Sequence, residues 1–346
     1  MDTTYQFVPI LIVGFAAALG LTPVSRHIAM RLGVVDKPTL PRKLHKDNKP
    51  MMGGLAIYSA ALISVMVFSP PQHLRELAAI MGGAGLLVIV GGLDDRYHLS
   101  VRVRLVANFL AALIVVLAGI QIRLFNQPLI DVPLTLVWIV ALVNAANFLD
   151  NMDGLTAGYS AIACGFFLLI ALAQGQVLVA LLAAAVFGSA LGFLAYNFSP
   201  SSTFMGDMGA LALGFMQAVL AIKLQFGTQP LSVTWMIPLL VLALPVFDIN
   251  LVVWTRLWER RSPFEGGRDH TSHRIMALGF SQRVTILIIY GGCVVYGALG
   301  LLISHLSPEA AGWVGAFSLS LLGILAIVMV WIRERVQKRP AHPPQG

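Results

Sequence analysis

The chain has 346 residues, 58% of them hydrophobic and 11% charged, with a mean hydropathy of +0.82 and a formal net charge of +7. Soluble domains carry about 25% charged residues, so this composition excludes an ordinary water-soluble enzyme. A membrane helix needs about 20 apolar residues, so about ten or eleven spans would use nearly the whole chain. Cys164 and Cys293 lie in apolar runs, which gives no sign of a disulfide framework or a Cys-based metal site.

Apolar stretches bounded by charged or turn residues predict an all-α integral membrane protein with about 11 transmembrane helices. In chain order the predicted spans are 7–24, 53–68, 77–93, 105–120, 132–146, 155–173, 177–195, 209–224, 233–254, 284–303 and 313–331. The first span has no Lys or Arg before it and is followed by further spans, so we interpret it as a membrane helix and not as a signal peptide. Residues 1–332 then form a single polytopic domain, and the basic, Pro-rich tail 333–346 is expected to be disordered.

The Lys and Arg residues predict the orientation, because basic residues near span ends concentrate on the cytoplasmic side. Of the 23 Lys and Arg residues, this threading assigns only Arg75, Arg123 and Lys223 to one face. The N-terminus is therefore expected outside and the C-terminus in the cytoplasm of a cell that carries the protein in its inner (plasma) membrane. Because the positive charge is explained by this asymmetry, no nucleic-acid partner is needed.

Two polar segments follow the first and third predicted spans on the inner face. The first inner loop, DKPTLPRKLHKDNKPMMGG, contains Lys43 and His45 and by itself resembles an ordinary basic cytoplasmic loop. The motif GGLDDRYHLSVRVR places Asp94 and Asp95 at the end of a membrane helix, followed by Arg102. Adjacent carboxylates repel each other unless a cation shares them, so this motif is either a solvated loop or a site for a divalent ion and phosphate.

Two further segments combine amides with carboxylates. The fifth span ends in NAANFLDNMDGL, where a continued helix would place Asn147, Asp150 and Asp153 on one side. Such polar density beside two apolar spans is costly in lipid and indicates a cavity or the membrane interface. The seventh span is followed by YNFSPSSTFMGDMGAL, with Asn197, Phe204 and an Asp207 flanked by glycines. A plain turn with a capping Asp is the alternative for that segment.

The longest inner loop, RSPFEGGRDHTSHR, supplies Arg268, His270 and His273, and Asp248 precedes it within the ninth span. Two His residues three apart could ligate a metal, but the surrounding arginines favour contact with phosphate. All these clusters fall on the same predicted face. An acidic centre suited to Mg²⁺, with Mn²⁺ as an alternative, surrounded by basic segments predicts a polyphosphate site. Its second substrate would be an amphiphile whose phosphate lies at headgroup level.

The ordered series of motifs, DKPTLPRKLH, PMMGGLAIY, GGLDDRYHLS, NFLDNMDGLTAG, STFMGDMGAL, PVFDINLVVWTR and RSPFEGGRDHTSH, resembles the polyprenyl-phosphate N-acetylhexosamine-1-phosphate transferases of the glycosyltransferase-4 group. This resemblance implies a helical bundle with a cytoplasmic active-site cleft and a broken ninth helix, for which Pro245 is a candidate break. It also implies that a lipid phosphate attacks the sugar-linked phosphorus of a UDP-sugar, giving polyprenyl-pyrophosphoryl-sugar and UMP.

The resemblance assigns roles residue by residue. It makes Asp207 the main Mg²⁺ ligand, with contacts from Asn147 and Asp95, and it leaves open whether Asp94 acts as base, nucleophile or positioning group. The remaining implied site residues are Asp150 and Asp153 on the nucleotide side, Asn197 and Phe204 at the uracil, Arg102 and His270 at phosphates, and Lys43, His45, Arg268 and His273 as further substrate contacts.

The sugar remains an open point in this resemblance. Relatives that use N-acetylglucosamine often carry His-x-His-His in the last loop, whereas this chain has His270, Thr271, Ser272 and His273. UDP-GlcNAc with undecaprenyl phosphate is the first expectation, and another UDP-N-acetylhexosamine or UDP-MurNAc-pentapeptide is the alternative. A lipid-linked sugar flippase is the alternative from another class, but transporters place ionisable groups near the midplane, where only Asp248 is expected. Dimers occur in this family, so a homodimer is one expected assembly.

Overall fold

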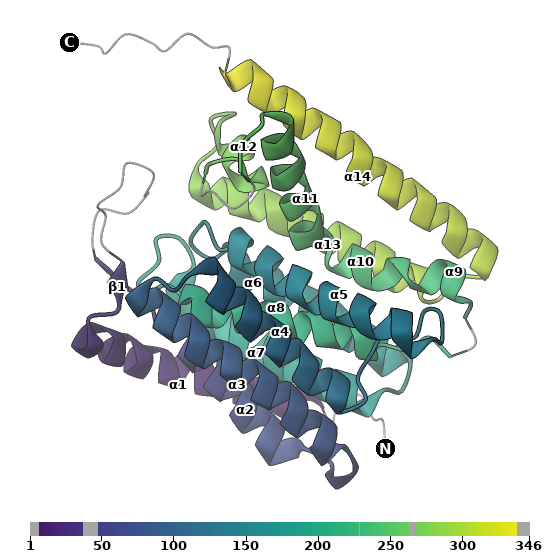
Figure 1. The fold of residues 1–346 in the computed structure, drawn as a ribbon, viewed down its shortest axis with the longest axis horizontal. Helices are drawn as coiled ribbons and strands as arrows, with labels where there is room; N and C mark the ends of the chain where they lie inside the picture. Colours follow the sequence, from purple (N-terminus) through teal and green to yellow (C-terminus); the bar gives the residue numbers. More distant parts are fainter. Residues whose placement is uncertain (1–6, 37–47, 228, 263–266, 338–346) are drawn as a thin grey trace.

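The computed structural model describes residues 7–36, 48–227, 229–262 and 267–337, and this part of the chain is almost entirely helical (Figure 1). A short antiparallel pair, β1 (Val35–Asp36) and β2 (Lys49–Pro50), follows the first helix. The helices are α1 (Val8–Leu32), α2 (Gly53–Phe68), η2 (Pro71–His73), α3 (Leu74–Tyr97), α4 (Val101–Leu117), α5 (Pro128–Leu149), α6 (Leu155–Ala173), α7 (Val177–Asn197), α8 (Gly206–Lys223), α9 (Leu231–Thr234), α10 (Met236–Val241), α11 (Ala243–Trp258), α12 (Thr271–Met276), α13 (Gln282–Ile303) and α14 (Pro308–Gln337).

Each of the eleven predicted spans coincides with a helix or, in the case of the ninth, with a bent series of helices. Within the described residues, eight helices are long and apolar enough to cross a bilayer, and nine crossings result if the bent series is counted. The other two, α2 and α4, have 16 and 17 residues. At 1.5 Å per residue they are about 25 Å long, slightly less than the roughly 30 Å hydrocarbon core. The protein is therefore a multi-pass membrane protein, while the count of eleven crossings stays a prediction.

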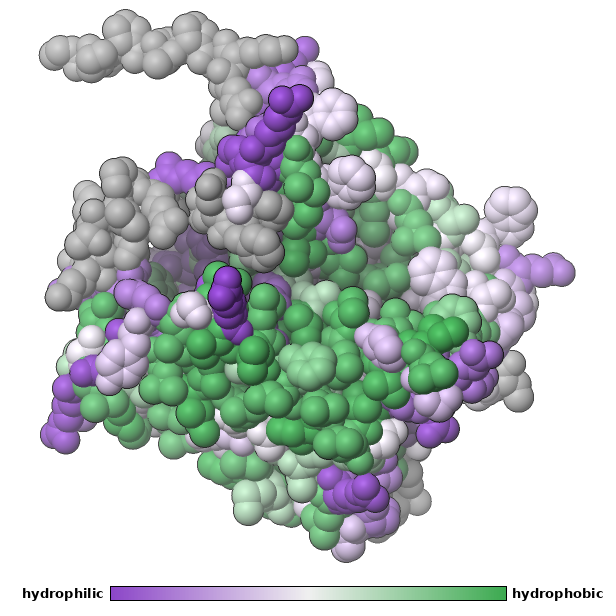
Figure 2. All heavy atoms as spheres, in the orientation of Figure 1, coloured by the Kyte–Doolittle hydropathy of each residue, from purple (hydrophilic) through white to green (hydrophobic). Residues whose placement is uncertain are grey.

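Apolar side chains cover the middle of the face seen in Figure 2, as expected of helices that face lipid. The helix α8 lies inside the bundle in contact with α2, α3, α5, α6 and α7, whereas α14 packs on the outside against α13, α11 and α12. The beginning of α1 and the end of α14 lie at opposite ends of the bundle (Figure 1), as an odd number of crossings requires. Which of these ends faces the cytoplasm stays a prediction.

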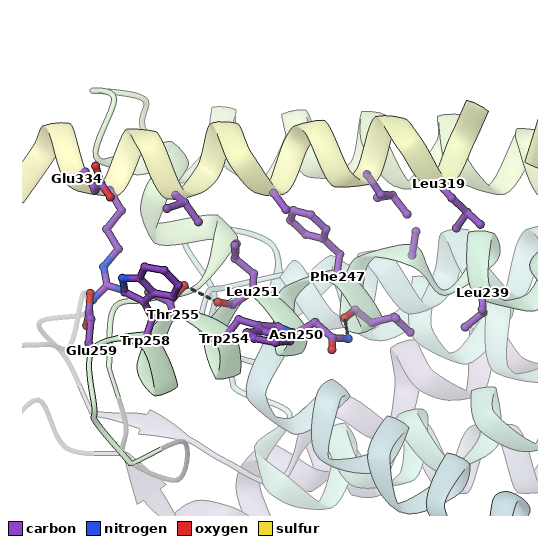
Figure 3. A pocket seen from close by; sticks show the side chains of 16 residues that line it. Leu239, Phe247, Asn250, Leu251, Trp254, Thr255, Trp258, Glu259, Leu319 and Glu334 are labelled. Atoms are coloured by element: carbon purple, nitrogen blue, oxygen red, sulfur yellow. Dashed lines mark hydrogen bonds and ion pairs between the residues drawn. The ribbon is translucent and has the colours of Figure 1, made fainter. Parts of the chain in front are cut away.

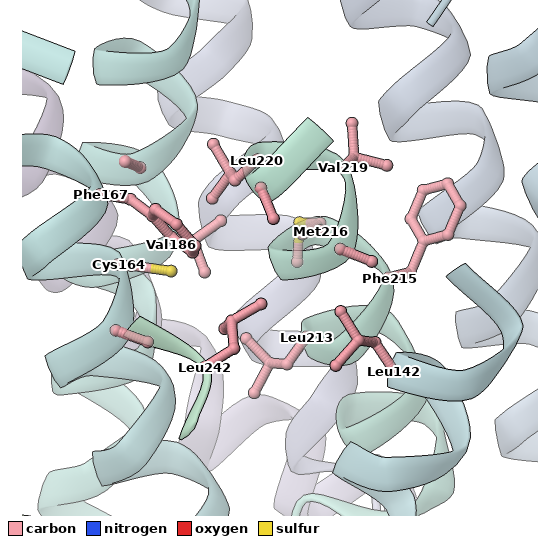
Figure 4. Packing of buried hydrophobic residues seen from close by; sticks show 14 of the residues in the cluster. Leu142, Cys164, Phe167, Val186, Leu213, Phe215, Met216, Val219, Leu220 and Leu242 are labelled. Carbon is pink, nitrogen blue, oxygen red and sulfur yellow. The ribbon is translucent and has the colours of Figure 1, made fainter. Parts of the chain in front are cut away.

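The interior is filled by apolar side chains of the central helices and contains a hydrogen-bonded polar cluster of Tyr159, Ser160 and Gln217. Phe167, Val186 and Leu213 from α6, α7 and α8 are packed together in Figure 4. In the same interior the Tyr159 hydroxyl donates to the Gln217 amide oxygen, and the Gln217 amide nitrogen donates to Ser160 Oγ at 2.7 Å. Because such polar groups would be costly unpaired in a bilayer, they fix α6 against α8 in one register.

The predicted break in the ninth span is present, and it lies three residues before Pro245. The axis bends by 81° between the segments 231–241 and 243–258, at Leu242. Pro245 has no N–H to donate to the carbonyl of residue 241, and its ring disfavours a continuous helix there. Proline is tolerated in the first turn of a helix, so α11 can begin again directly after the bend.

The C-terminal helix is longer than the sequence predicts. The predicted disordered tail begins at residue 333, whereas α14 continues to Gln337. Arg333 explains part of this extension, because Nη2 lies 2.7 Å from Glu259 Oε2 and 3.1 Å from Asp269 Oδ1. Residues 338–346 lie outside the described part of the chain.

Candidate active site

Three segments far apart in the sequence meet at one end of the bundle: the end of α3, the end of α5 and the start of α8. The backbone N–H of Asp207 donates to Asp95 Oδ1 at 2.9 Å, and Asn147 Nδ2 donates to Asp207 Oδ1 at 2.8 Å. These bonds join residues that are 112 and 60 positions apart. The predicted convergence of Asp95, Asn147 and Asp207 is therefore confirmed as geometry.

Glycines allow α3 to approach the start of α8 this closely. A Cβ atom on Gly91 would lie 2.4 Å from Met208 Cα, and one on Gly206 would lie 2.3 Å from Asp95 Oδ2. Gly206 also has φ +70°, a backbone conformation that L-residues with side chains rarely adopt. A side chain at residue 206 would therefore occupy the space beside the Asp95 carboxylate.

Arg104 lies between two of the carboxylates. Its Nη1 is 3.0 Å from Asp94 Oδ2 and 3.6 Å from Asp207 Oδ2, and its side chain is one-third exposed. Asp94 is held further by the Leu99 N–H, which donates to Oδ1 at 2.6 Å. The guanidinium thereby offsets the repulsion between two carboxylates that share this end of the bundle.

Both Arg102 and Arg104 follow the aspartate pair in sequence, and the predicted site includes Arg102 but not Arg104. Arg102 is exposed at the start of α4, whereas Arg104 points toward the acidic cluster. The helical spacing places Arg104 on the same face as Asn108, Ala111 and Val115, which are all buried. This spacing could have predicted that Arg104 faces the interior of the bundle. A residue two positions away on a helix faces the opposite side, as Arg102 does.

The residues predicted to lie on the nucleotide side belong to two segments that are hydrogen-bonded to each other. Asp153 Oδ2 accepts from the Ser201 N–H at 2.9 Å. Asn197 is fully occupied by backbone: Oδ1 accepts from the Gly154 N–H and Nδ2 donates to the Thr203 carbonyl, both at 3.0 Å. Asn197 therefore joins the α5–α6 turn to the α7–α8 loop. Phe204, in the same loop, is half-buried.

The predicted helical register of Asn147, Asp150 and Asp153 is wrong. The helix α5 ends at Leu149, and Asp150 follows with φ −76° and ψ 56°. The Asn151 side chain donates to the Phe148 carbonyl at 3.1 Å, which satisfies a helix-terminal acceptor. Gly154 then adopts φ +78° before α6 begins. The carboxylates reach the site from a turn, which the apolar period of the preceding helix could not reveal.

Asp150 has a strongly perturbed environment. Burial, together with the negative charges of Asp207 and Asp153, raises the pKa of Asp150 to about 7. A carboxyl group with a pKa near the working pH, placed among other acids, is typical of a functional site.

The last polar loop is attached to the same site by its own hydrogen bonds. His270 Nδ1 lies 2.7 Å from Asp248 Oδ2, and Ser272 Oγ donates to Asn151 Oδ1 at 2.7 Å. The ring of His273 lies 6.1 Å from that of His270, and burial, with the electrostatic effects of His270 and Arg268, lowers the pKa of His273 to about 4. His273 is thus neutral at physiological pH.

A second ion cluster anchors this loop to α11 and α14. Asp269, which is buried, lies 3.0 Å from Arg256 Nε and 3.1 Å from both Arg261 Nη2 and Arg333 Nη2. Burial alone would raise the pKa of Asp269, but the hydrogen bonds from Arg261 and Arg256 outweigh it and lower that pKa. Arg268 lies beside this cluster and is exposed.

An apolar groove of about 500 Å³ runs between α11 and α14 next to this cluster. In Figure 3 the side chains of Trp254 and Trp258 lie along one side and Leu319 along the other. Glu259 and Arg333 stand at the polar end of the groove. The groove thus leads from the ion cluster into the apolar depth of the molecule.

Within the described residues, no group of three or more His, Cys, Asp or Glu side chains is arranged to enclose a metal ion. The donors present nevertheless fit Mg²⁺, which is usually bound through one or two carboxylates together with water and substrate phosphates. Asp207 and Asp95 supply carboxylate oxygens, and the Asn147 amide is hydrogen-bonded to Asp207 beside them. Asp95 Oδ2 is buried and has no hydrogen-bond partner among the described residues. Lys43 and His45 lie outside those residues.

Comparison with known proteins agrees with this geometry. The sequence profile described as glycosyl transferase family 4 matches residues 77–225, a range that contains Asp94, Asn147 and Asp207. A probable undecaprenyl-phosphate N-acetylglucosaminyl 1-phosphate transferase of Bacillus subtilis is 33% identical over 338 residues, which are 95% of this chain and 92% of that protein. The undecaprenyl-phosphate alpha-N-acetylglucosaminyl 1-phosphate transferase of Yersinia pestis is 28% identical over 95% of this chain and 93% of its own length. The protein of the same name from Escherichia coli K12 is also 28% identical, over 82% of this chain and 81% of its own length.

Proposed function

The chain belongs to the polyprenyl-phosphate N-acetylhexosamine-1-phosphate transferases of glycosyl transferase family 4, and on this premise we propose that it transfers GlcNAc-1-phosphate from UDP-GlcNAc to undecaprenyl phosphate. An oxygen of the lipid phosphate forms a bond to the sugar-linked phosphorus. The bond from that phosphorus to the UMP phosphate oxygen breaks, so UMP leaves. The products are undecaprenyl-pyrophosphoryl-GlcNAc and UMP.

One observation carries this proposal: Asp94 and Asp207 both contact the Arg104 guanidinium, at 3.0 and 3.6 Å, beside the Asn147 amide. Phosphoryl transfer demands little covalent chemistry from the protein and depends on positioning and charge stabilisation. A cluster that combines two carboxylates, an amide and an arginine provides groups for a metal ion and for phosphate oxygens.

We propose Mg²⁺ as the cofactor, with Asp207, Asn147 and Asp95 as its protein donors and Mn²⁺ as an alternative ion. When bound, the ion would neutralise phosphate oxygens and hold them in line for displacement. Asp95 also accepts the Asp207 N–H and so fixes the start of α8, on which Asp207 lies. Its second oxygen lies beside Gly206 and has no hydrogen-bond partner among the described residues, which supports its inclusion in the metal site.

The lipid phosphate needs no strong base to become a nucleophile, because a phosphate monoester with a second pKa near 6 is largely ionised at neutral pH. Asp94 is itself held by the Leu99 N–H and by Arg104. We therefore assign Asp94 a positioning role toward the ion and the acceptor phosphate. The apolar groove between α11 and α14 supports a lipid acceptor, since its apolar lining suits a hydrocarbon chain.

The nucleotide would lie against the two loops that join α5 to α6 and α7 to α8. Asp150 and Asp153 are the carboxylates on this side, and the half-buried Phe204 ring is available to stack on uracil. Asn197 holds the two loops together through both ends of its amide, so we assign it to the support of the uracil site. His270 and Arg268 in the last loop are the proposed phosphate contacts.

The choice of GlcNAc rests on the names of the relatives, since the loop residues His270, Thr271, Ser272 and His273 depart from the His-x-His-His pattern. Another UDP-N-acetylhexosamine is the alternative donor. A flippase is less favoured, because Asp248, the acid expected deepest in the membrane, is paired with His270 of the polar loop.

The test is reconstitution in lipid nanodiscs with undecaprenyl phosphate, Mg²⁺ and a panel of UDP-sugars. We expect a pyrophosphoryl lipid product from UDP-GlcNAc that depends on both the lipid and the ion. Product from UDP-MurNAc-pentapeptide alone would reassign the donor. Movement of a preformed lipid-linked sugar across the bilayer, without any transfer, would replace the enzyme by a flippase.

A further inference from the structure

We propose that Asp248 is a positioning residue for the transfer reaction, holding the His270 ring in one tautomer and one orientation so that Nε2 is the nitrogen left to contact a substrate phosphate. This inference rests on the proposed function and extends the site to a residue on α11, the helix that follows the bend. Asp248 touches no proposed substrate group and acts only through His270.

Both carboxylate oxygens of Asp248 are engaged by consecutive residues of the last loop. Oδ2 lies 2.7 Å from His270 Nδ1, and Oδ1 accepts from the Thr271 N–H at 2.7 Å. The Asp248 side chain is 2% exposed and that of His270 9% exposed. The carboxylate therefore cannot turn away from the imidazole without also breaking its bond to the Thr271 backbone.

A carboxylate can only accept hydrogen bonds, so Asp248 requires a proton on His270 Nδ1. In a neutral ring the lone pair then lies at Nε2, and in an imidazolium ring Nε2–H is a charge-assisted donor for a phosphate oxygen. In both cases the hydrogen bond at Nδ1 fixes the plane of the ring and leaves Nε2 as the only ring nitrogen for a substrate.

The loop around His270 is fastened from two other sides, but these contacts do not reach the ring. On one side Ser272 Oγ donates to Asn151 Oδ1 at 2.7 Å, and on the other Asp269 pairs with Arg256 at 3.0 Å. They set where the loop lies relative to the nucleotide-side turn. Orientation of the imidazole itself comes from the Asp248 carboxylate, which is hydrogen-bonded to the ring.

Stability alone does not account for an aspartate at this place. Desolvation offsets most of the attraction within a buried ion pair, and apolar replacements of similar volume are often neutral or stabilising. Asp248 lies among the apolar residues of α11, so the relevant comparison is replacement of the Asp248–His270 pair as a whole by apolar residues. Orientation of a catalytic imidazole is the gain that an apolar residue could not supply.

Asp248→Asn tests the proposal with little change of shape. If the asparagine oxygen keeps the Thr271 N–H, its NH₂ group faces His270 Nδ1 and requires the opposite tautomer. Ser320→Ala is the control, because Ser320 is exposed on α14, donates to the Ala316 carbonyl of its own helix at 2.8 Å, and is not among the residues that line the apolar groove.

We expect Asp248→Asn to lower kcat about 10- to 100-fold, with a melting temperature close to that of Ser320→Ala and KM for UDP-GlcNAc within about threefold of the wild type. In a His270→Ala background, Asp248→Asn should lower the remaining kcat by less than about twofold, because the residue on which Asp248 acts is gone. Equal losses in both backgrounds, or wild-type kcat in Asp248→Asn, would overturn the proposal.

A spectroscopic readout separates this proposal from the proposed function. With isotope-labelled imidazole nitrogens, the resonances lost in His270→Ala identify His270. We expect the Nδ1–H tautomer in the wild-type protein and the Nε2–H tautomer in Asp248→Asn. An unchanged tautomer contradicts the role of Asp248. Absence of UMP release by the wild type, with the tautomer shift present, contradicts the proposed function instead.

Discussion

The backbone N–H of Asp207 donates a 2.9 Å hydrogen bond to the carboxylate of Asp95, across 112 positions of sequence. Asp95 lies in the last turn of α3 and Asp207 in the first turn of α8, so one side chain caps the helix that carries the other. A carboxylate at a helix N-terminus satisfies a free N–H group and is favoured by the helix dipole. This one contact joins the stability of the bundle end to the position of the proposed metal ligand.

We predict that Asp95→Ala lowers the free energy of unfolding by about 1 kcal/mol, the usual cost of a lost cap, and abolishes transfer. Asp95→Asn should keep most of the stability, because the amide oxygen can still accept the Asp207 N–H. Unfolding in detergent micelles measures both. Ser281→Ala is the control, because it removes the cap of α13, where Ser281 Oγ accepts from Val284 N, without touching the cluster. An Asp95→Ala protein as stable as the wild type would show that the capping bond contributes nothing.

Arg104 and Arg102 give opposing predictions for two arginines on one helix. Arg104→Ala leaves Asp94 and Asp207 without their shared cation, and we expect kcat/KM to fall by about 100-fold or more. Arg102→Ala, at an exposed position, should change kcat/KM by less than about tenfold. Steady-state kinetics with UDP-GlcNAc decides between them. The reverse order of effects would remove Arg104 from the site.

Gly91→Ala should separate α3 from α8. The new Cβ would lie 2.4 Å from Met208 Cα, and overpacking of this kind costs about 1–3 kcal/mol. Gly82, on the same helix, has open space around its Cα, so Gly82→Ala should be neutral or slightly stabilising. Thermal unfolding of the two variants, followed by the transfer assay, checks this pair. Equal stability of both would mean that the close approach at Gly91 is not needed.

The raised pKa of Asp150 predicts a pH-dependent stability. Because its pKa is about 7 in the folded protein and 3.8 ordinarily, the folded state binds more protons between these values. Stability contributed by this group is present below about pH 4 and is lost as the pH rises toward 7. In Asp150→Asn this loss disappears, so its melting temperature should fall less than that of the wild type between acidic and neutral pH. Parallel curves for both proteins would place the titration elsewhere.

The positions of the helices could be predicted because membrane spans are recognisable from their length and apolar composition. The match is exact at α2 and α6, which are predicted and observed at residues 53–68 and 155–173. The ends of other helices could not be placed in this way. The helix α1 continues past Val24 to Leu32, since its last turns need no lipid and are held by contacts with neighbouring helices.

The acids of the site could be predicted from local sequence, but their partners could not. Asp94, Asp95 and Asp207 stand out because charges are rare in this chain. The link from Asp95 to the Asp207 backbone, and the pairing of Asp248 with His270, depend on which helix ends lie side by side. The family resemblance implies a uracil contact for Asn197, whereas its amide is hydrogen-bonded to the Gly154 and Thr203 backbone. Hydrogen bonds of this kind follow from tertiary structure.

The fate of the sugar-linked phosphate tests the central claim most directly. UDP-GlcNAc radiolabelled at that phosphate is incubated with undecaprenyl phosphate, Mg²⁺ and either the wild-type protein or Asp207→Ala. The proposed reaction moves the label into the lipid fraction and releases unlabelled UMP, and Asp207→Ala leaves the label on UDP-GlcNAc. Release of labelled UDP, with sugar but no label in the lipid, would show that the enzyme breaks the bond between sugar and phosphate and would contradict the account.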